Sequence, residues 1–406
     1  MAEKKHSLII HTRLEEQVSR TPDILALLDN DRSFTYDQLN KQANQIAHAI
    51  VELLGTENNT VAVLLEHGAM SIIGIYAVLK AAKVAVSLDV DHPIDHNQRV
   101  IINSGAIGII TNNKNILLGK QIASHDTLII NIDELSDDLP ISNLNLSVSP
   151  TDYARMTYSS GSTGNPKGIV REHRSLTQSP VNHSPGERIS HILSLAFSAS
   201  SGNIFNPLFG GGAVCCYDIK ERGLGGVADW LIDDKITNFN PQLLVLRHLN
   251  RTLPKGTLFP DIQTVKLAGQ VIFKQDIEKF RQFLSPQAVI RHALGSTEVG
   301  LISFYDIKVD TVLDEGVVPV GIPFEATEIT LLGEDGKQVP MGEIGSIAVT
   351  GNRIASGYWN NEKLTAQKFI PGKDVDGKRT FLSDDLGRWR SDGMLEFLGR
   401  KDFEVK

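Results

Sequence analysis

Cysteine is scarce in this sequence, and its placement excludes several kinds of site. The 406 residues contain two cysteines, which are neighbours at Cys215 and Cys216. Adjacent cysteines are badly placed for a structural disulfide or for a zinc site with four ligands. We therefore expect a protein of the reducing cytoplasm in which both cysteines belong to the core.

Long apolar runs and basic clusters are also missing. No stretch approaches the ~20 apolar residues that a membrane helix needs, and the apolar segment 8–10 is too short for the core of a signal peptide. The 40 basic and 48 acidic residues leave a net charge of −8, with no run rich in lysine or arginine. The sequence therefore predicts no membrane segment and no nucleic-acid partner.

The remaining composition is that of a globular enzyme. Hydrophobic residues make up 41% of the chain and charged residues 22%, which is too apolar for a disordered chain. A chain of this length is expected to form two or three lobes.

The first part of the chain alternates between helical and strand patterns. Thr35 and Gln38 have the spacing of a capping box, and apolar residues then recur at helical intervals until Gly55. Strands are predicted at 60–65, 84–88, 107–110 and 128–132, with a helix at 69–83. This alternation favours a mostly parallel, doubly wound sheet, which we assign to a first α/β subdomain at 1–190.

Two further subdomains are predicted. A second doubly wound α/β subdomain at 191–309 has strand patterns at 191–197, 212–217, 243–246 and 265–268 and helical patterns at 226–234 and 274–283. From 310 to 398 the pattern changes to short alternating segments at 326–332, 345–350 and 394–398 with turn residues between them. This last part is interpreted as a small antiparallel, β-barrel-like subdomain.

The segment 158–168 carries the strongest chemical signal. Hydroxyl residues and glycines lead up to a single lysine, so backbone amides, hydroxyls and one cation can converge on a polyphosphate. A flexible surface loop is the alternative, and the spacing is not that of a Walker P-loop. The candidate phosphate-binding residues are Ser159, Ser160, Gly161, Ser162, Thr163, Gly164 and Lys167.

This segment resembles the phosphate-loop signature of the adenylate-forming (ANL) superfamily, which includes acyl-CoA synthetases, luciferases and the adenylation domains of nonribosomal peptide synthetases. Further stretches resemble that family's motifs in the family's order and extend the resemblance over nearly the whole chain. They lie at 34–39, 79–93, 292–298, 342–358, 381–389 and 399–406. The chain is most similar to the N-terminal core of a peptide-synthetase adenylation domain.

The resemblance implies ATP and Mg²⁺ as cofactors and gives roles to individual residues. Glu298 would bind the magnesium, Thr297 would contact the α-phosphate and Asp385 would hold the ribose, with Lys167, Thr297 and Glu298 as the catalytic set. Leu294 stands where the family has a tyrosine, and Asp384 where it has a glycine. The remaining nucleotide-binding candidates are Gly269, Ala293, Gly295, Ser296, Phe397 and Arg400.

The segment 399–406 resembles the family's hinge motif, with Asp402 as its pivot. In the family a mobile C-terminal subdomain follows and carries a catalytic lysine. Because the sequence ends at this motif, we expect the core of a longer polypeptide that binds its ligands but reacts slowly by itself.

Ser198 carries the substrate hypothesis. In amino-acid-activating relatives the motif is phenylalanine, aspartate, any residue and serine, and the aspartate binds the substrate's α-ammonium. Here Ser198 has no charge. Leaving an ammonium without its partner costs about 3–5 kcal/mol, against about 0.5–1.5 kcal/mol from one neutral hydrogen bond. The substitution predicts an aryl, arylalkyl, fatty, α-keto or α-hydroxy acid; an amino acid held by a carboxylate from elsewhere is the alternative.

The resemblance also implies a deep, apolar substrate pocket. Lys266 and Ala268 have the same parity along a strand, so both should face the pocket if either does, and the lysine would then meet a keto oxygen or a second carboxylate. The candidate pocket residues are Phe197, Ser198, Ala199, Gly202, Phe239, Lys266, Ala268, Ala293, Leu301 and Ile302.

The function that these observations favour is ATP-dependent formation of an acyl-adenylate, followed by transfer to the phosphopantetheine thiol of a carrier protein. A stand-alone acyl-CoA ligase, which would use coenzyme A, is the alternative, and a nucleotide-binding module without chemistry is a third. His173 and His183 flank a charged, proline-containing segment and are expected to be exposed rather than catalytic.

Overall fold

The computed structural model describes residues 6–30, 32–160, 166–179, 181–372 and 378–401 and forms two compact units. The first unit comprises 1–187, 193–218 and 355–362, and the second comprises 188–192, 219–354 and 363–406. The four subdomain segments expected from the sequence, which end at 190, 309, 398 and 406, stay a prediction.

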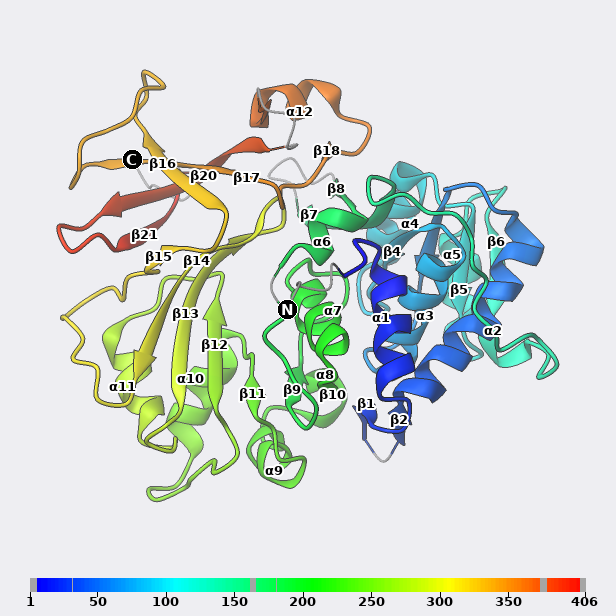
Figure 1. Ribbon diagram of the computed structural model, residues 1–406, viewed down its shortest axis with the longest axis horizontal. Coiled ribbons are helices and arrows are strands. Elements are labelled where there is room, and N and C mark those ends of the chain that lie inside the picture. The colour runs from blue at the N-terminus through cyan, green and yellow to red at the C-terminus, as the bar shows by residue number, and fades with distance from the viewer. Residues whose placement is uncertain (1–5, 31, 161–165, 180, 373–377, 402–406) are drawn as a thin grey trace. The chain divides into compact units, whose positions relative to one another are not determined.

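The helices in the described residues are labelled in Figure 1. They are α1 (Ile10–Arg20), α2 (Tyr36–Leu54), α3 (Ala69–Lys80), α4 (Ile94–Ser104), α5 (Ile116–Ile122), α6 (His173–Thr177), α7 (Ser200–Gly210), α8 (Ile219–Arg222), α9 (Val227–Asp233), α10 (Leu243–Thr252), α11 (Lys274–Arg281) and α12 (Glu362–Lys368), with a 3₁₀ turn at Ile132–Glu134. Among the described residues, no helix has both the length and the apolarity that crossing a membrane requires.

The strands of the first unit are β1 (Leu25–Asp29), β2 (Arg32–Thr35), β3 (Thr60–Val63), β4 (Val84–Ser87), β5 (Gly108–Thr111), β6 (Leu128–Asn131), β7 (Tyr153–Ser160), β8 (Pro166–Glu172), β10 (Ala213–Cys216) and β18 (Gly357–Tyr358). Those of the second unit are β9 (Arg188–His191), β11 (Asn238–Phe239), β12 (Thr264–Ala268), β13 (Val289–Ser296), β14 (Gly300–Lys308), β15 (Ile322–Pro323), β16 (Thr327–Leu332), β17 (Ile344–Gly351), β19 (Phe369–Pro371), β20 (Arg379–Trp389) and β21 (Leu395–Arg400).

The first unit contains the doubly wound sheet that the sequence predicts. Its strand order is β18-β8-β7-β4-β3-β5-β6, parallel from β7 to β6 and antiparallel at β8 and β18. Val61 and Val63 of β3 pack in one core with α2 and α3, while Ala62 of the same strand packs with α4 and α5 in another. Helices therefore cover both faces. A further three strands, β10-β1-β2, also belong to this unit.

The predicted capping box begins α2. The Gln38 amide donates to Thr35 Oγ1 at 3.2 Å, and the Thr35 amide donates to Gln38 Oε1 at 2.9 Å. The two bonds satisfy donors that a helix start otherwise leaves without partners, so this part of the prediction is confirmed.

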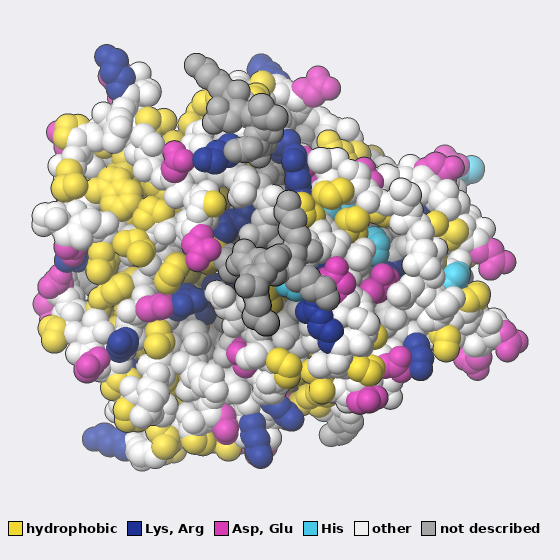
Figure 2. All heavy atoms as spheres, in the orientation of Figure 1, with side chains coloured by type: hydrophobic (Ala, Val, Ile, Leu, Met, Phe, Trp, Pro, Cys, Tyr) yellow, Lys and Arg dark blue, Asp and Glu magenta, His cyan; other side chains and the backbone are white. Residues whose placement is uncertain are grey.

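In the second unit β9, β11, β12 and β13 are parallel, and β14 and β15 continue the sheet antiparallel. A row of phenylalanines, with Phe280 of α11 touching Phe239 and Phe259, fills the core on the side of helices α10 and α11. In the view of Figure 1 these helices lie behind the strands, and Figure 2 shows apolar side chains gathered over β14 and β15.

The small sheet of the second unit is open. Its order is β16-β17-β20-β19, and β21 pairs with β20. The long strand β20 pairs with β17 along one edge, while β19 and β21 share the other. The antiparallel pairing predicted for this part is confirmed, but the sheet is not closed, so its description as barrel-like is wrong.

Two predicted strands differ from the structure. The apolar run 243–246 begins helix α10, because its buried residues Leu243, Val245, Leu246 and Leu249 continue at helical spacing while Leu244 remains exposed. The strand expected at 191–197 ends at His191 instead. The residues after it form the turn that precedes α7, where the Ser200 amide donates to the Phe197 carbonyl at 3.1 Å.

His173 is buried, with 1% of its surface exposed, so the expected exposure of this residue is wrong. Its Nδ1 accepts a hydrogen bond from the Ile10 amide at 3.3 Å, and its ring meets that of His11 edge to face at 5.8 Å. Burial lowers the pKa of His173 to about 4, although Asp152 raises it somewhat. Burial also lowers the pKa of His11 to about 3, and His173 and Lys80 add to the effect.

These depressed pKa values predict that acid destabilises the first unit. Below the ordinary histidine pKa of 6.5 the unfolded chain takes up protons that the folded chain does not bind, until the pH reaches about 4 for His173. The free energy of unfolding should therefore fall by about 1.4 kcal/mol per pH unit for each such histidine. His173→Gln should reduce this slope by roughly one proton, as measured by urea unfolding from pH 7 to pH 5.

His125→Gln is the matched control, because the His125 side chain is 99% exposed. An unchanged pH slope in His173→Gln would contradict the assignment.

Candidate active site

The predicted phosphate loop joins two paired strands. Ser159 lies directly opposite Lys167, and the Ser160 backbone lies opposite Pro166, where β7 pairs antiparallel with β8. Pairing brings the hydroxyl residue and the lysine to the same end of a hairpin. The predicted residues Gly161, Ser162, Thr163 and Gly164 lie outside the described residues.

A close approach at Gly168 stabilises the base of this hairpin. A Cβ atom at this position would lie 3.0 Å from Cζ of Tyr158, so a side chain at residue 168 would force the ring of Tyr158 to shift. The Tyr158 hydroxyl donates to Asn103 Oδ1 at 2.8 Å. The last described residues before and after the loop are therefore held by packing as well as by the strand ladder.

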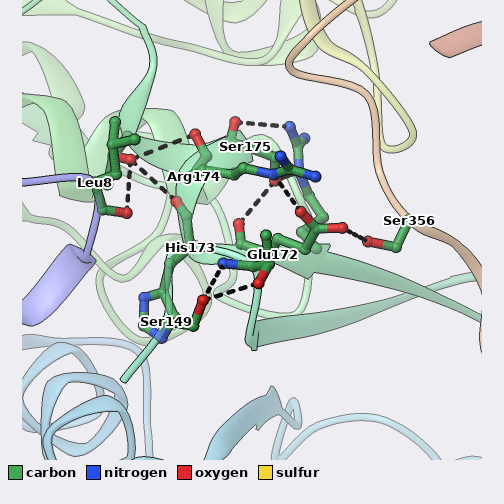
Figure 3. A network of polar contacts seen from close by, with 10 residues as sticks. Leu8, Ser149, Glu172, His173, Arg174, Ser175 and Ser356 are labelled. Carbon is green, nitrogen blue, oxygen red and sulfur yellow. Dashed lines mark hydrogen bonds and ion pairs between the residues drawn. The ribbon is translucent and has the colours of Figure 1, made fainter. Parts of the chain in front are cut away.

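The far end of β8 is tied down by a buried carboxylate (Figure 3). Glu172 accepts hydrogen bonds from Ser356 Oγ at 2.8 Å and from Arg174 Nε at 2.5 Å. The Ser175 hydroxyl donates to the Glu172 carbonyl at 2.8 Å. This network connects the strand after the phosphate loop to helix α6 and to the segment 355–362 of the same unit.

The turn that carries the predicted substrate residues is anchored to β7. The buried guanidinium of Arg155 donates to the Leu195 carbonyl at 2.5 Å, to Ser201 Oγ at 2.6 Å and to Ser200 Oγ at 3.1 Å. Sequence reasoning missed Arg155. Its only signal was a charged residue within a strand whose other residues are mostly apolar.

Four predicted pocket residues lie on this turn and on the first turn of α7. Phe197, Ala199 and Gly202 are exposed and Ser198 is half-buried, whereas Ser200 and Ser201 face inward. The structure thus brings these four residues together on one accessible side of the first unit. A Cβ atom at Gly202 would meet no atom within 4 Å.

Thr297 and Glu298 lie in the three-residue turn between β13 and β14, where Ser296 pairs with Gly300. The approach of the two strands is close, because a Cβ atom at Gly295 would lie 2.8 Å from the Gly300 carbonyl oxygen. Both predicted phosphate and metal residues are half-buried at this end of the sheet. Leu294 is buried, with 3% exposed.

One face of the second unit's sheet carries several predicted pocket residues. Lys266 pairs in register with Arg291, and Ala268 pairs with Ala293, so these side chains share a face. Leu301 and Ile302 follow at an irregularity in the β13–β14 ladder. Gly269 continues directly from β12 with a φ of 84°.

Phe239 does not share this face. It pairs with Val265, whose side chain lies on the opposite side of the sheet from Lys266, and its ring packs against Phe280. Phe239 is fully buried under α11. The structure therefore places it in the hydrophobic core and not with Lys266 and Ala268, in disagreement with the sequence-based pocket.

Two positively charged side chains on this face, Arg291 and Lys266, have different surroundings. Arg291 forms a bidentate ion pair with Asp306 at 2.6 and 2.7 Å. Burial lowers the pKa of Lys266, and the positive charge of Arg291 lowers it further. Because Arg291 is already paired with Asp306, the ammonium of Lys266 is the group on this face that can best accept a new anionic or carbonyl partner.

Asp385, the predicted ribose ligand, lies in the small sheet with two other predicted nucleotide-binding residues. Asp385 of β20 lies directly opposite Arg400 of β21, and Phe397 lies opposite Gly387. Asp384 is occupied by an ion pair with Lys368 at 2.7 Å. Asp402, the predicted hinge pivot, lies outside the described residues.

The residues present suit magnesium that arrives with a nucleotide. In the described part of the chain no three acidic, histidine or cysteine side chains converge on a metal position. Mg²⁺ is commonly held by one or two carboxylates together with phosphate oxygens and water. A single half-buried carboxylate at a strand end, Glu298, fits that mode of binding.

Comparison with known protein families shows the family to which the chain belongs. A profile described as AMP-binding enzyme matches residues 14–359, which is most of the chain. The chain belongs to this family. The match confirms the family that the resemblance of its motifs predicted. Asp385, Phe397 and Arg400 lie beyond the matched residues, so their roles depend on the motif and on strand pairing.

Curated relatives are peptide synthetases. A mycosubtilin synthase protein of Bacillus subtilis is 32% identical over 413 residues, which cover 98% of this chain and 15% of that protein. Tyrocidine synthase 1 of Brevibacillus parabrevis is 30% identical over 406 residues, covering 98% of this chain and 36% of that protein. The chain therefore spans well under half the length of these relatives.

Solved structures confirm the fold. The nonribosomal peptide synthetase FmoA3 superposes with a TM-score of 0.87 at 24% identity, covering 97% of this chain and 42% of that one. The N-terminal subdomain of NpsA from Klebsiella oxytoca gives a TM-score of 0.83 at 22% identity, covering 97% of this chain and all of that one. The predicted α/β fold, which both of these structures share, is thus confirmed.

Gly202 offers a test that separates stability from binding. Glycine in a helix interior costs about 0.5–1 kcal/mol relative to alanine, and the space beside Gly202 is open. We expect Gly202→Ala to raise the melting temperature by up to about 3 °C. The same methyl group should weaken the binding of acids with bulky tails if α7 lines the pocket.

Gly119→Ala in α5 is the control, because its Cβ would meet only ordinary contacts from 3.6 Å. It should stabilise without changing acid binding. Equal effects of the two variants on binding would remove Gly202 from the pocket.

Proposed function

We propose that this protein activates a carboxylic acid without an α-amino group as its acyl-adenylate, at the expense of ATP. The observation that carries the proposal is Ser198 at the start of α7, on the accessible side of the first unit. The segment 195–202, which forms this turn, contains no acidic residue. A substrate ammonium would find no countercharge in the segment where amino-acid-activating relatives supply one.

Two structural neighbours were solved with acyl groups of different kinds. The NpsA subdomain was solved with 3-hydroxybenzoyl-AMSN, an aryl acyl compound, and FmoA3 with α-methyl-L-serine-AMP. The same fold therefore accepts both kinds of acyl group, and the side chain at position 198 becomes the discriminating feature. Lys266 adds a group that would meet a keto oxygen or a second carboxylate of the acid.

The chemistry would be a displacement at the α-phosphorus of ATP. A carboxylate oxygen of the acid forms a bond to that phosphorus while the bond to the departing pyrophosphate breaks. Lys167 would offset the charge of the phosphates, and the hydroxyls near it would donate hydrogen bonds to their oxygens. Thr297 would orient the α-phosphate, and Asp385 would accept hydrogen bonds from the ribose. Magnesium held by Glu298 would supply further charge neutralisation.

The acceptor of the acyl group would be a carrier-protein thiol. One neighbour is an artificial fusion of NpsA with ThdA, described as an adenylation–PCP di-domain. This chain resembles the same fold over 97% of its length. Free coenzyme A as the better acceptor in an acyl-transfer assay would instead identify a stand-alone ligase.

The substrate proposal is tested by comparing acids that differ only at the α-carbon. Single-turnover formation of acyl-AMP, followed by mass spectrometry, should favour amine-free acids over the matching L-amino acids. Ser198→Asp should shift this preference at least tenfold toward the amino acids, because it restores a carboxylate for the ammonium. Ser194→Asp, four residues earlier, is the control. A wild-type preference for amino acids would refute the proposal.

The nucleotide assignment is tested at Glu298. Glu298→Gln keeps the size of the side chain but removes its charge, so acyl-AMP formation should fall about a hundredfold or more. Part of the loss should return at high magnesium concentration, since the defect is in metal binding. Glu278→Gln on α11 is the control, because this carboxylate is 39% exposed. A Glu298→Gln variant with full activity would rule out the assigned role.

A further inference from the structure

Arg155 combines properties that a purely structural arginine rarely has. It is 1% exposed, lies on β7 four residues before Ser159, and within the described residues its three hydrogen bonds all go to the segment 195–201. None of its hydrogen-bond partners among the described residues is a carboxylate; they are one carbonyl and two hydroxyls. A positive charge is thus buried against the predicted substrate turn, and no described residue pairs with it as a countercharge.

The surroundings of Arg155 do not cancel this charge. Burial lowers the pKa of Arg155 to about 10, and the neighbouring charge of Arg171 contributes, so the guanidinium remains protonated at neutral pH. Its other contact is the ring of Phe205, 5.9 Å from the guanidinium carbon. Its Nε is buried without a hydrogen-bond partner among the described residues. At such a buried position the field of a charge is less screened than it is in water.

The hydrogen bonds of Arg155 place its charge close to the turn that contains Ser198. Arg155 bonds to Leu195, Ser200 and Ser201, which lie on both sides of Ser198 in the sequence. The Ser201 amide, in turn, donates to the Ser198 carbonyl at 3.0 Å. The guanidinium therefore contacts residues on both sides of Ser198, the residue beside which a substrate α-ammonium would be bound.

We propose that Arg155 is a specificity-determining residue that disfavours α-ammonium substrates by electrostatic repulsion from behind the Leu195–Ser201 turn. The inference rests on the proposed function, because it takes the Ser198 side of the turn as the place of the substrate's α-carbon. It adds a second, active cause of selectivity. Ser198 withholds the attraction that an ammonium needs, and Arg155 supplies repulsion, so the turn favours a neutral or electron-rich α-substituent.

A purely structural role predicts something different. Hydrogen bonds to one carbonyl and two hydroxyls can be made by neutral donors, and burying a charge without a counterion destabilises the folded state. If Arg155 only held the turn, its replacement would weaken the binding of all acids alike. If its charge matters, replacement changes the ratio of affinities.

The experiment measures that ratio by binding, independently of turnover. Non-hydrolysable sulfamoyl-adenosine analogues of L-phenylalanyl and 3-phenylpropanoyl adenylate differ only in the α-ammonium, and their Kd values are measured by isothermal titration at pH 7. Arg155→Gln, which keeps a donor for the Leu195 carbonyl, should lower the ratio of the ammonium Kd to the neutral Kd about tenfold. Arg155→Lys, which keeps the charge, should leave the ratio unchanged while weakening both ligands.

Arg13→Gln is the matched control. Arg13 is also a buried arginine of the first unit, donates to the Thr177 carbonyl at 2.7 Å and lies over the ring of Phe209 near the other end of α7. It should lose stability without changing the ratio. Arg155→Met, which fills a similar volume, replaces the glutamine variant if that variant does not fold.

The outcomes separate this inference from the proposed function. An unchanged ratio in Arg155→Gln, or an equal change in Arg155→Lys, overturns the role of the Arg155 charge. A wild-type protein that binds the ammonium analogue more tightly refutes the proposed function, whereas a tenfold shift on neutralising Arg155 would still support the repulsion argued here.

Discussion

The hydrogen bonds from Arg155 to the Leu195–Ser201 turn are the interaction on which the candidate site of the first unit depends. They join the strand that leads into the phosphate loop to the turn that precedes α7, over a separation of 40 to 46 residues in the sequence. A guanidinium can donate in several directions from one rigid plane, so one side chain fixes a carbonyl and two hydroxyls together. The predicted nucleotide segment and the predicted substrate turn are therefore positioned by the same group.

The strand on the other side of the phosphate loop is held by the opposite charge. Glu172, at the end of β8, accepts from Ser356 and Arg174 and so ties that strand to a segment nearly two hundred residues away in the sequence. With Arg155 on β7 and Glu172 on β8, each strand of the hairpin has its own buried polar anchor. Polar anchors of this kind specify one arrangement, since a shifted strand would leave a buried charge without its partners.

Strand parity organises the second unit in a comparable way. The pairing of β12 with β13 places Lys266, Ala268 and Ala293 on one face, and the same pairing turns Val265 toward the helices. Phe239 follows Val265 and joins the aromatic core with Phe280. In a sheet one residue of register decides whether a side chain faces a ligand or the core, which makes pocket assignments from motif position alone sensitive to single-residue errors.

Much of the local structure followed from short-range pattern. The capping box at Thr35 and Gln38 and the helix at 226–234 depend on neighbours within a few residues, so the sequence alone predicted them. The helix at 243–252 was misjudged because four apolar residues fit a buried strand as well as a helix.

The burial of His173, the face of Phe239 and the partners of Arg155 depend on contacts between distant segments. Sequence by itself thus determined the family and the order of its motifs. Only the tertiary structure decided which side chains those motifs bring together, because contacts between distant segments produce no periodic pattern in the sequence.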